Sequence, residues 1–303
     1  VGVEFLSTLA NDTATADGLR AIPSGAIIDR VLVRQDLTKY FLPTVDGQIL
    51  PLPIGEAIRD GGAKRVPLLA GYNADEGTIF YPDRKSPTAL SDTISGSMAQ
   101  REAMLEGVFG VNSAKALQAL YGMTSLESWD RGAEKMLGDD WFGVHTRFLA
   151  KANVAADQPT WLYHFSRTPP GKSQTLGAHH AAEIPFVFNS HSGFLPLSGD
   201  DDILTERITS YWTNFAKTGN PNGDGLPEWP AYTPDDDIWL ELDHEIKRIS
   251  RLRARKLDIF ESNLNHRIDA IKQSKTPLEL IENTALLSTA AGLGGEERIA
   301  NSD

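Results

Sequence analysis

Apolar residues along this chain form short continuous runs and longer stretches with helical spacing. The run Val66–Gly71 is uninterrupted, which is typical of a strand buried on both faces of a parallel sheet. Aromatic and β-branched residues dominate Thr160–Phe165, so this segment also predicts a strand. In Ile238–Leu242, aliphatic residues occupy every second position, which indicates a final strand near an edge of the sheet.

Helical spacing covers much of the remaining chain. Residues 16–29 repeat apolar positions at helical intervals, and residues 97–155 contain three such stripes, so we expect a helical insertion there. Residues 203–217 predict an amphipathic helix that Gly219 ends. Its apolar face consists of Leu204, Ile208, Trp212 and Phe215, which we interpret as core residues.

The order strand, helical stretch, strand, helix, strand predicts an open α/β sheet with helices packed on its faces. In such sheets the chemistry lies on loops that follow the carboxyl ends of the strands. The loops after the first two predicted strands are therefore the places to look for a site.

These two loops carry a carboxylate and an imidazole. Glu76 follows the first strand, and Gly77 behind it allows a sharp turn of the backbone. The loop after the second strand contains His179 and His180. A carboxylate and a histidine on neighbouring loops are two parts of a triad, in which the histidine accepts a serine proton and the carboxylate orients the ring. Acid before histidine also matches the chain order serine, acid, histidine of α/β-hydrolases.

The third part of the triad is missing from the sequence. No serine stands in the Gly-x-Ser-x-Gly pattern that the nucleophile of such enzymes needs, and the glycine-rich segment for the oxyanion is missing too. The chain also opens in mid-pattern with Val1 instead of Met. We therefore expect an internal cut, a processed chain or a partial sequence.

Five segments in register resemble the type-B carboxylesterase family, the cholinesterase-like branch of the α/β-hydrolases. They are FLPTVDG at 41–47, VPLLAGYNADEG at 66–77, GAHHAAEIPFVF at 177–188, YWTNFAKTGNPN at 211–222 and WPAY at 229–232. The likeness runs from about residue 16 to about residue 261 and concerns the C-terminal half of the family only. It implies the C-terminal portion of a mostly parallel α/β-hydrolase sheet with helices on both faces and a helical insertion.

The resemblance also implies roles for particular residues. Glu76 would be the triad acid and His180 the base. His180 is preferred to His179 because the family places its histidine three residues before a glutamate, here Glu183, which would be a buried supporting residue or form a salt bridge. Trp141 and Phe142 stand where the family lines its acyl side, so contact with substrate is one interpretation and plain packing is the other.

The function implied is hydrolysis of a small-molecule carboxylic ester through an acyl-enzyme. The missing N-terminal half would supply the serine and the oxyanion hole, and no metal or organic cofactor is implied. Two alternatives stay open: a non-catalytic cholinesterase-like binding module, and a subunit that a partner chain completes. Loss of triad residues would favour the binding module. The two triad residues that belong to this half of the family sequence, Glu76 and His180, are both present.

The composition of the chain limits the kinds of partner and site that we expect. A net charge of −12 argues against nucleic-acid binding, which needs a basic face. No apolar run approaches the roughly 18 residues of a membrane span. The absence of cysteine excludes disulfides and thiolate sites but leaves the compartment open, cytoplasmic or secreted. The acidic runs 200–202 and 235–237 predict a helix start and a solvated turn, and neither has the spacing of metal ligands.

The chain divides into two parts by pattern. Residues 1–261 correspond to the C-terminal part of a carboxylesterase domain, and residues 262–303 form a helical or flexible extension. In the extension, Thr276 and Glu279 form a capping box around Pro277, which predicts a helix ending near Gly292.

Overall fold

The computed structural model describes residues 15–33, 43, 45–61, 65–80, 96–168, 170, 174–191 and 199–273. The predicted capping box at 276–279, and residues 41, 42 and 44 of the first family segment, lie outside this part of the chain. The chain forms two compact units, residues 1–53 and residues 54–303. Each unit is described by itself.

The first described segment of the first unit, residues 15–33, is mostly helical, as the pattern of residues 16–29 predicts. It contains α2 (Ala16–Arg20) and α3 (Ser24–Val33). Farther along, the carboxylate of Asp46 accepts hydrogen bonds from the backbone N–H groups of Gln48 and Ile49, at 2.9 and 2.8 Å. Gly47 has a positive φ of 74°, so the Asp-Gly pair makes the turn expected from its composition.

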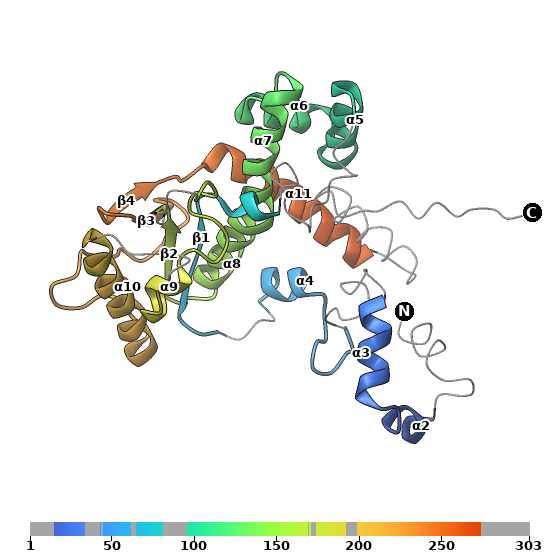
Figure 1. The fold of residues 1–303 in the computed structure, drawn as a ribbon, viewed down its shortest axis with the longest axis horizontal. Helices are drawn as coiled ribbons and strands as arrows, with labels where there is room; N and C mark the ends of the chain where they lie inside the picture. Colours follow the sequence, from blue (N-terminus) through green and yellow to red (C-terminus); the bar gives the residue numbers. More distant parts are fainter. Residues whose placement is uncertain are drawn as a thin grey trace, which may run out of the picture. The chain divides into compact units, whose positions relative to one another are not determined.

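A twisted sheet organises the second unit (Figure 1). Its described strands are β1 (Leu68–Asn73), β2 (Thr160–Phe165), β3 (Ile238–Leu242) and β4 (Lys247–Ser250), in that spatial order. β1 pairs with β2 and β2 with β3 in parallel, whereas β4 pairs with β3 in the antiparallel direction. The predicted strands are thus present, and the carboxyl ends of the parallel strands lie at one edge.

Two details of the sheet differ from the prediction. The strand β4 was not predicted, and it makes β4, not β3, the last strand of the described sheet. Leu68 to Gly71 of β1 are partly exposed instead of buried on both faces, because β1 has only β2 as a neighbour among the described strands. Val66 is 51% exposed and precedes the strand.

Helices cover both faces of the sheet. The predicted insertion consists of α5 (Met98–Phe109), α6 (Val111–Tyr121), α7 (Leu126–Gly138), a π-helical turn η4 (Asp139–Gly143) and α8 (Val144–Ala155). The other elements are α4 (Ile54–Arg59), the 3₁₀ helix η2 (Glu76–Ile79), α9 (Ile184–Phe188), α10 (Gly199–Thr218) and α11 (Ala254–Gln273). Helix α8 contacts β1 and β2 on one face, while α9 and α10 lie beyond the other (Figure 1).

Alternation along β2 explains why both faces are covered. Trp161 and Phe165 pack with Ile208 of α10, whereas Leu162 packs on the opposite face with Ala150 of α8. Full burial of one such apolar side chain stabilises the fold by about 1.5–3 kcal/mol. The helices on each face of the sheet therefore both contribute to its stability. The predicted apolar face of α10 packs into the first of these clusters, as expected: Leu204, Ile208, Trp212 and Phe215.

Helix α11 packs against the helical insertion, and together they form a third apolar cluster. Leu257 and Phe260 pack there beside Leu264 and Ile268, so the helix runs through residue 261 without interruption. The division of the chain at residue 261 stays a prediction. Among the described helices, none is both long and apolar enough to cross a membrane.

The acidic runs have different outcomes. Residues 200–202 lie in the first turn of α10, as predicted from the helix dipole. Asp237 is buried, whereas the sequence predicted a solvated turn at 235–237. The reason is tertiary: its carboxylate accepts a hydrogen bond from Trp239 Nε1 at 2.9 Å and lies 4.0 Å from the guanidinium of Arg147.

Candidate active site

The structure brings Glu76 and His180 together at the carboxyl edge of the parallel strands. Glu76 opens the 3₁₀ helix η2 directly after β1, and His180 lies on the loop that leads into α9. The ring Nδ1 of His180 is 2.7 Å from Oε2 of Glu76. An ionised carboxylate can only accept, so Nδ1 carries the hydrogen in this pair. The expected meeting of the two side chains is therefore present.

Glu76 is almost fully enclosed. Its side chain is 6% exposed, and its other oxygen, Oε1, accepts a hydrogen bond of 2.8 Å from the backbone N–H of Asn73. Burial raises the pKa of Glu76, against the bonds from Asn73 and His180, which lower it. The negative charge of Glu183 nearby raises the Glu76 pKa further.

Close packing of backbones makes this enclosure possible. A Cβ atom at Gly77 would lie 1.9 Å from the carbonyl oxygen of Glu134 on α7. A Cβ atom at Gly138, at the end of the same helix, would make a tight contact of 3.3 Å with the Cβ of Glu76. The glycine after the acid is therefore required by the close approach of α7. Gly77 has no positive φ, so the turn that the sequence assigned to it does not itself need glycine.

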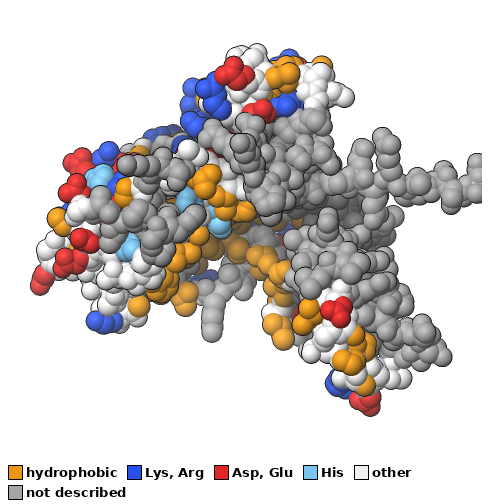
Figure 2. Space-filling model, viewed as in Figure 1, with side chains coloured by type: hydrophobic (Ala, Val, Ile, Leu, Met, Phe, Trp, Pro, Cys, Tyr) orange, Lys and Arg blue, Asp and Glu red, His pale blue; other side chains and the backbone are white. Residues whose placement is uncertain are grey.

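His180 is more accessible than its partner. Its side chain is 41% exposed and lies against aromatic rings, with ring centroids 5.2 Å from Phe80 and 5.0 Å from Phe142. The ring of Trp141 is tilted against that of Phe80, with centroids 5.5 Å apart. Histidine and hydrophobic side chains lie side by side on the face of the molecule shown in Figure 2. A role of Trp141 or Phe142 in substrate contact stays a prediction.

The two loops are joined by backbone and side-chain bonds around Asp75. The N–H of Asp75 donates to the carbonyl of Ala178 at 3.0 Å, and the N–H of Ala178 donates to Asp75 Oδ2 at 2.9 Å. Thr78 Oγ1 donates to the carbonyl of Leu176 at 2.9 Å. Gly177 adopts a positive φ of 67° beside the Asp75 carboxylate, where a Cβ would clash. This geometry sets the distance between the acid loop and the histidine loop.

The neighbouring histidine has a different environment. His179 is buried, and its Nδ1 lies 2.8 Å from the carbonyl oxygen of His180. Because a carbonyl only accepts, the Nδ1 of His179 donates into the loop. Of the two adjacent histidines, His180 is therefore the one that meets the carboxylate of Glu76.

Comparison with known proteins gives the same family as the motifs. A model of the Carboxylesterase family matches residues 5–260. The chain belongs to the carboxylesterase family. It is 30% identical over 253 residues to para-nitrobenzyl esterase of Bacillus subtilis (strain 168), which covers 80% of the chain and 48% of that protein. It is 26% identical to mouse carboxylesterase 1C over 272 residues, 84% of the chain and 48% of that protein.

Solved structures agree on the fold of this carboxylesterase-family chain. A PNB esterase structure superposes with a TM-score of 0.65 at 26% identity and covers 84% of the chain and 52% of that structure. The α/β-hydrolase fold predicted from the sequence is thereby confirmed. The chain spans about half the length of the relatives it matches.

Asn73, a residue of this carboxylesterase-family chain that the sequence analysis did not single out, connects the acid loop to the histidine loop. Its Nδ2 donates to the carbonyl of His179 at 2.8 Å and to Glu183 Oε2 at 2.5 Å. Glu183, which the sequence analysis took as a buried supporting residue or a member of a salt bridge, is half-buried and accepts a hydrogen bond from this amide. A hydrogen-bonding residue at the last position of β1 is the signal that could have identified Asn73.

A buried polar cluster around Asp139, next to the acid loop, was also not predicted from the sequence. Asp139 is fully buried in η4 and accepts hydrogen bonds from Tyr121 and Tyr72, at 2.5 and 3.3 Å. Arg253 Nη1 lies 2.6 Å from the same carboxylate, and its Nη2 donates to the carbonyl of Ala74 at 3.1 Å. No local pattern in the sequence signals this group, because its members come from distant elements.

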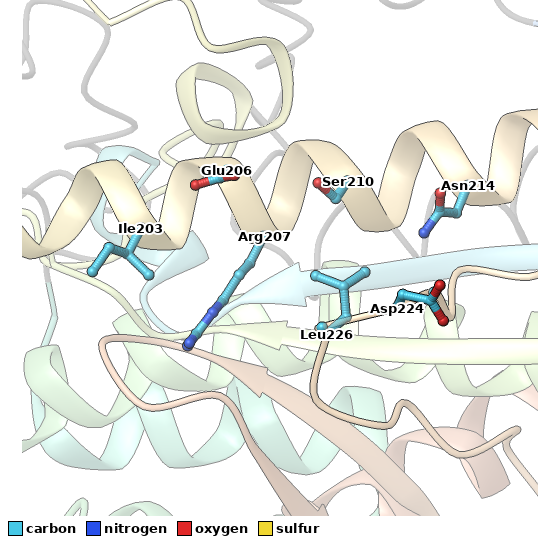
Figure 3. Close-up of a pocket in the computed structure, with 9 residues that line it drawn as sticks. Ile203, Glu206, Arg207, Ser210, Asn214, Asp224 and Leu226 are labelled. Carbon is cyan, nitrogen blue, oxygen red and sulfur yellow. The ribbon is translucent and has the colours of Figure 1, made fainter.

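Elsewhere in the described part of the chain, metal-binding groups and surface depressions are the other features that could form a site. In the described residues no group of three or more His, Cys, Asp or Glu could hold a metal ion. A depression of about 460 Å³ lies between α10 and the loop 223–226 (Figure 3). It contains neither Glu76 nor His180, and its lining includes Ile203, Glu206, Ser210, Asn214, Asp224 and Leu226.

Proposed function

We propose that this chain is the part of a serine ester hydrolase that carries the triad acid, Glu76, and the triad base, His180. An upstream segment supplies the nucleophilic serine and the oxyanion hole. The substrate is a small carboxylic ester, and the reaction passes through an acyl-enzyme. The printed names of the relatives, among them para-nitrobenzyl esterase, support ester hydrolysis as the reaction class.

One observation carries the proposal: the 2.7 Å contact between Glu76 Oε2 and His180 Nδ1 on adjacent strand-end loops. With the hydrogen on Nδ1, the lone pair of the neutral ring is on Nε2. No described residue bonds to this Nε2. A partly exposed base with a buried orienting acid is the arrangement that proton transfer from a serine needs.

The reaction follows from this arrangement. The serine oxygen attacks the ester carbonyl while its proton passes to Nε2 of His180. The imidazolium then gives that proton to the departing alcohol, and an acyl-enzyme remains. Water attacks the acyl group in the same way, with its proton passing through His180 to the released serine. Glu76 stabilises the imidazolium because its buried carboxylate lies 2.7 Å from the ring.

The rival functions make different demands on these residues. A binding module needs neither the carboxylate nor the imidazole, whereas this chain holds both in hydrogen-bonding contact. A subunit completed by a partner chain would use the same pair and would differ only in the source of the serine. The geometry therefore favours an enzyme over a binding module.

The test compares two adjacent histidines in a full-length protein that includes the upstream segment. With a short-chain aryl ester as substrate, His180→Ala lowers kcat by on the order of 10⁴-fold or more. His179→Ala, the matched control, keeps turnover within about tenfold because its ring donates into the loop. Intact turnover in His180→Ala together with loss in His179→Ala would overturn the assignment of the base.

A further inference from the structure

Asn73 makes hydrogen bonds on both sides of the Glu76–His180 pair. It is the last residue of β1 and is 1% exposed. Its backbone N–H donates to Glu76 Oε1, the oxygen that His180 does not use. Its side-chain Nδ2 donates to the carbonyl of His179 and to the carboxylate of Glu183.

The direction of the Asn73 amide is set by its partners. A backbone carbonyl and a carboxylate can only accept, so both hydrogens of Nδ2 are engaged. Turning the amide over would place Oδ1 against two oxygen atoms. The carbonyl of His179 would then keep only its bond from the backbone N–H of Ala182, at 3.0 Å. Among the described residues Oδ1 has no hydrogen-bond partner, which fits a side chain selected as a donor.

The bond to His179 reaches the ring of His180 through a rigid unit. The carbonyl oxygen of His179 belongs to the planar peptide group that ends at the Cα of His180. That oxygen accepts from Asn73 Nδ2 at 2.8 Å and from the N–H of Ala182 at 3.0 Å. The bond from Asn73 is the one that comes from the acid loop's strand, and it helps to orient the peptide plane and the direction in which the His180 side chain leaves the backbone. The same residue thus orients the acid directly and the base through one peptide plane.

We propose that Asn73 is a positioning residue for the Glu76–His180 pair, an inference that rests on the ester-hydrolase function proposed above. It acts through two hydrogen bonds of its amide and one of its backbone, and it does not touch the reacting atoms. Glu183 is its anchor: the short bond to Glu183 Oε2 prevents the amide from rotating away from His179.

Thr78 offers a matched control. Its hydroxyl also joins the two loops, at 2.9 Å from the carbonyl of Leu176, but it does not contact the peptide group before His180. Thr78→Val removes this bond with little change in volume. If Asn73 only tied the loops together, Thr78→Val and Asn73→Leu would affect the Glu76–His180 hydrogen bond equally. If Asn73 positions the pair, only Asn73→Leu would weaken that bond.

The experiment follows the His180 Nδ1–H proton by NMR in the full-length protein labelled with ¹⁵N-histidine, and its readout does not depend on catalytic activity. The signal is assigned by its loss in His180→Gln. Asn73→Leu speeds exchange of this proton with water by about tenfold or more, the equivalent of one hydrogen bond, or abolishes the signal. Thr78→Val leaves the exchange rate within about threefold, because its lost bond lies outside this peptide plane.

Glu183 gives a second, independent pair of variants. Glu183→Gln still offers a carbonyl oxygen to Asn73 and keeps the slow exchange, whereas Glu183→Leu removes the acceptor and speeds it. If Asn73→Leu fails to fold, as judged by near-UV circular dichroism and the signals of the other histidines, the Glu183 pair decides. Slow exchange in both Asn73→Leu and Glu183→Leu, or in Glu183→Leu alone where Asn73→Leu does not fold, overturns the proposal.

The outcomes also separate this inference from the function it rests on. Absence of a protected Nδ1–H signal in the unsubstituted full-length protein contradicts the Glu76–His180 pair, and with it the ester-hydrolase proposal. A protected signal that is insensitive to Asn73 and Glu183 contradicts only the positioning role.

Discussion

Asp139 and Arg253 form an ion pair of 2.6 Å, although they are separated by 114 positions in the chain. Asp139 lies in the same π-helical turn as Phe142, and Arg253 also donates to the carbonyl of Ala74, two residues before Glu76. Single-turn π-helices are often found at functional sites. The pair therefore connects the aromatic side of the His180 ring with the backbone that carries Glu76.

Replacing one member of this ion pair should lower the stability of the fold strongly. Arg253→Met leaves the buried carboxylate of Asp139 without its cation, which lowers the free energy of unfolding by about 3–5 kcal/mol. Arg248→Met is the matched control, because Arg248 forms a pair of 2.6 Å with Glu228 in which both side chains are at least half exposed. It should change the free energy of unfolding by at most about 1 kcal/mol. Urea unfolding of both variants measures the difference, and equal effects would contradict a special role for the buried pair.

The packing of Gly77 against α7 predicts a strong effect of one added methyl group. Gly77→Ala brings a Cβ onto the Glu134 carbonyl and should lower the free energy of unfolding by about 2 kcal/mol or more. Gly107→Ala is the control within a helix, since nothing lies within 4 Å of a Cβ there. Alanine at that site should raise stability by about 0.5–1 kcal/mol. Thermal unfolding of the two variants would then shift in opposite directions.

The burial of Glu76 predicts a pH-dependent difference in stability. Burial raises the pKa of Glu76 above that of the unfolded chain, so the folded state binds a proton more readily. The stability from this group is present below the unfolded pKa of about 4.3 and is lost as pH rises through the folded pKa. Glu76→Gln cannot ionise, so its urea midpoint relative to the unsubstituted chain should rise from pH 4 to pH 7. Glu127→Gln, at a side chain that is 88% exposed, should show no such trend.

The same substitution should have the opposite effect on activity. In the full-length protein, Glu76→Gln places an amide where His180 needs a carboxylate, and the ring loses both its tautomer and the stabilisation of its imidazolium. We expect kcat to fall by on the order of 10⁴-fold while the fold is kept. Steady-state kinetics with an aryl ester checks this, and a loss below tenfold would remove Glu76 from the triad.

His164 should contribute to acid unfolding. It is buried on β2 with its ring 4.9 Å from that of Tyr72, and burial, together with the charge of Arg253, lowers the pKa of His164 to about 3. A histidine whose pKa is lowered by folding destabilises the folded state as pH falls below the unfolded value of about 6.5. The loss is about 1.4 kcal/mol per pH unit until pH approaches 3.

A substitution isolates this contribution. His164→Gln should flatten the fall in stability between pH 6.5 and pH 4, measured from urea midpoints. The exposed His244 provides the control, and His244→Gln should follow the unsubstituted chain. A pH dependence that is unchanged in His164→Gln would show that other groups cause the acid unfolding.

Part of the fold could be predicted because its signals are local. The helical spacing of 97–155 and 203–217 reflects burial of one face of each helix, and the aromatic run at 160–165 reflects a strand packed on both sides. β4 could not be found in this way. Its four residues, KRIS, are mostly exposed, and the strand exists because β3 offers it a backbone to pair with.

Asp237 shows the limit of reasoning from composition. Three consecutive aspartates predict a solvated turn, and two of them are exposed. The third is buried because Trp239 and the fully enclosed Arg147 provide a donor and a positive charge. Whether a polar side chain can be buried depends on partners that the local sequence does not contain.

The amino-acid sequence alone determined the identity and order of the chemical groups: a carboxylate after one strand, a histidine after the next, and helical stretches to cover the sheet. These follow from periodicity and motif, which are properties of neighbouring residues. Only the tertiary structure decided which histidine meets Glu76, that Asn73 joins their loops, and that Asp139 and Arg253 support them from below. Such contacts depend on distances between elements far apart in the chain, and those distances exist only after the sheet and its helices have packed.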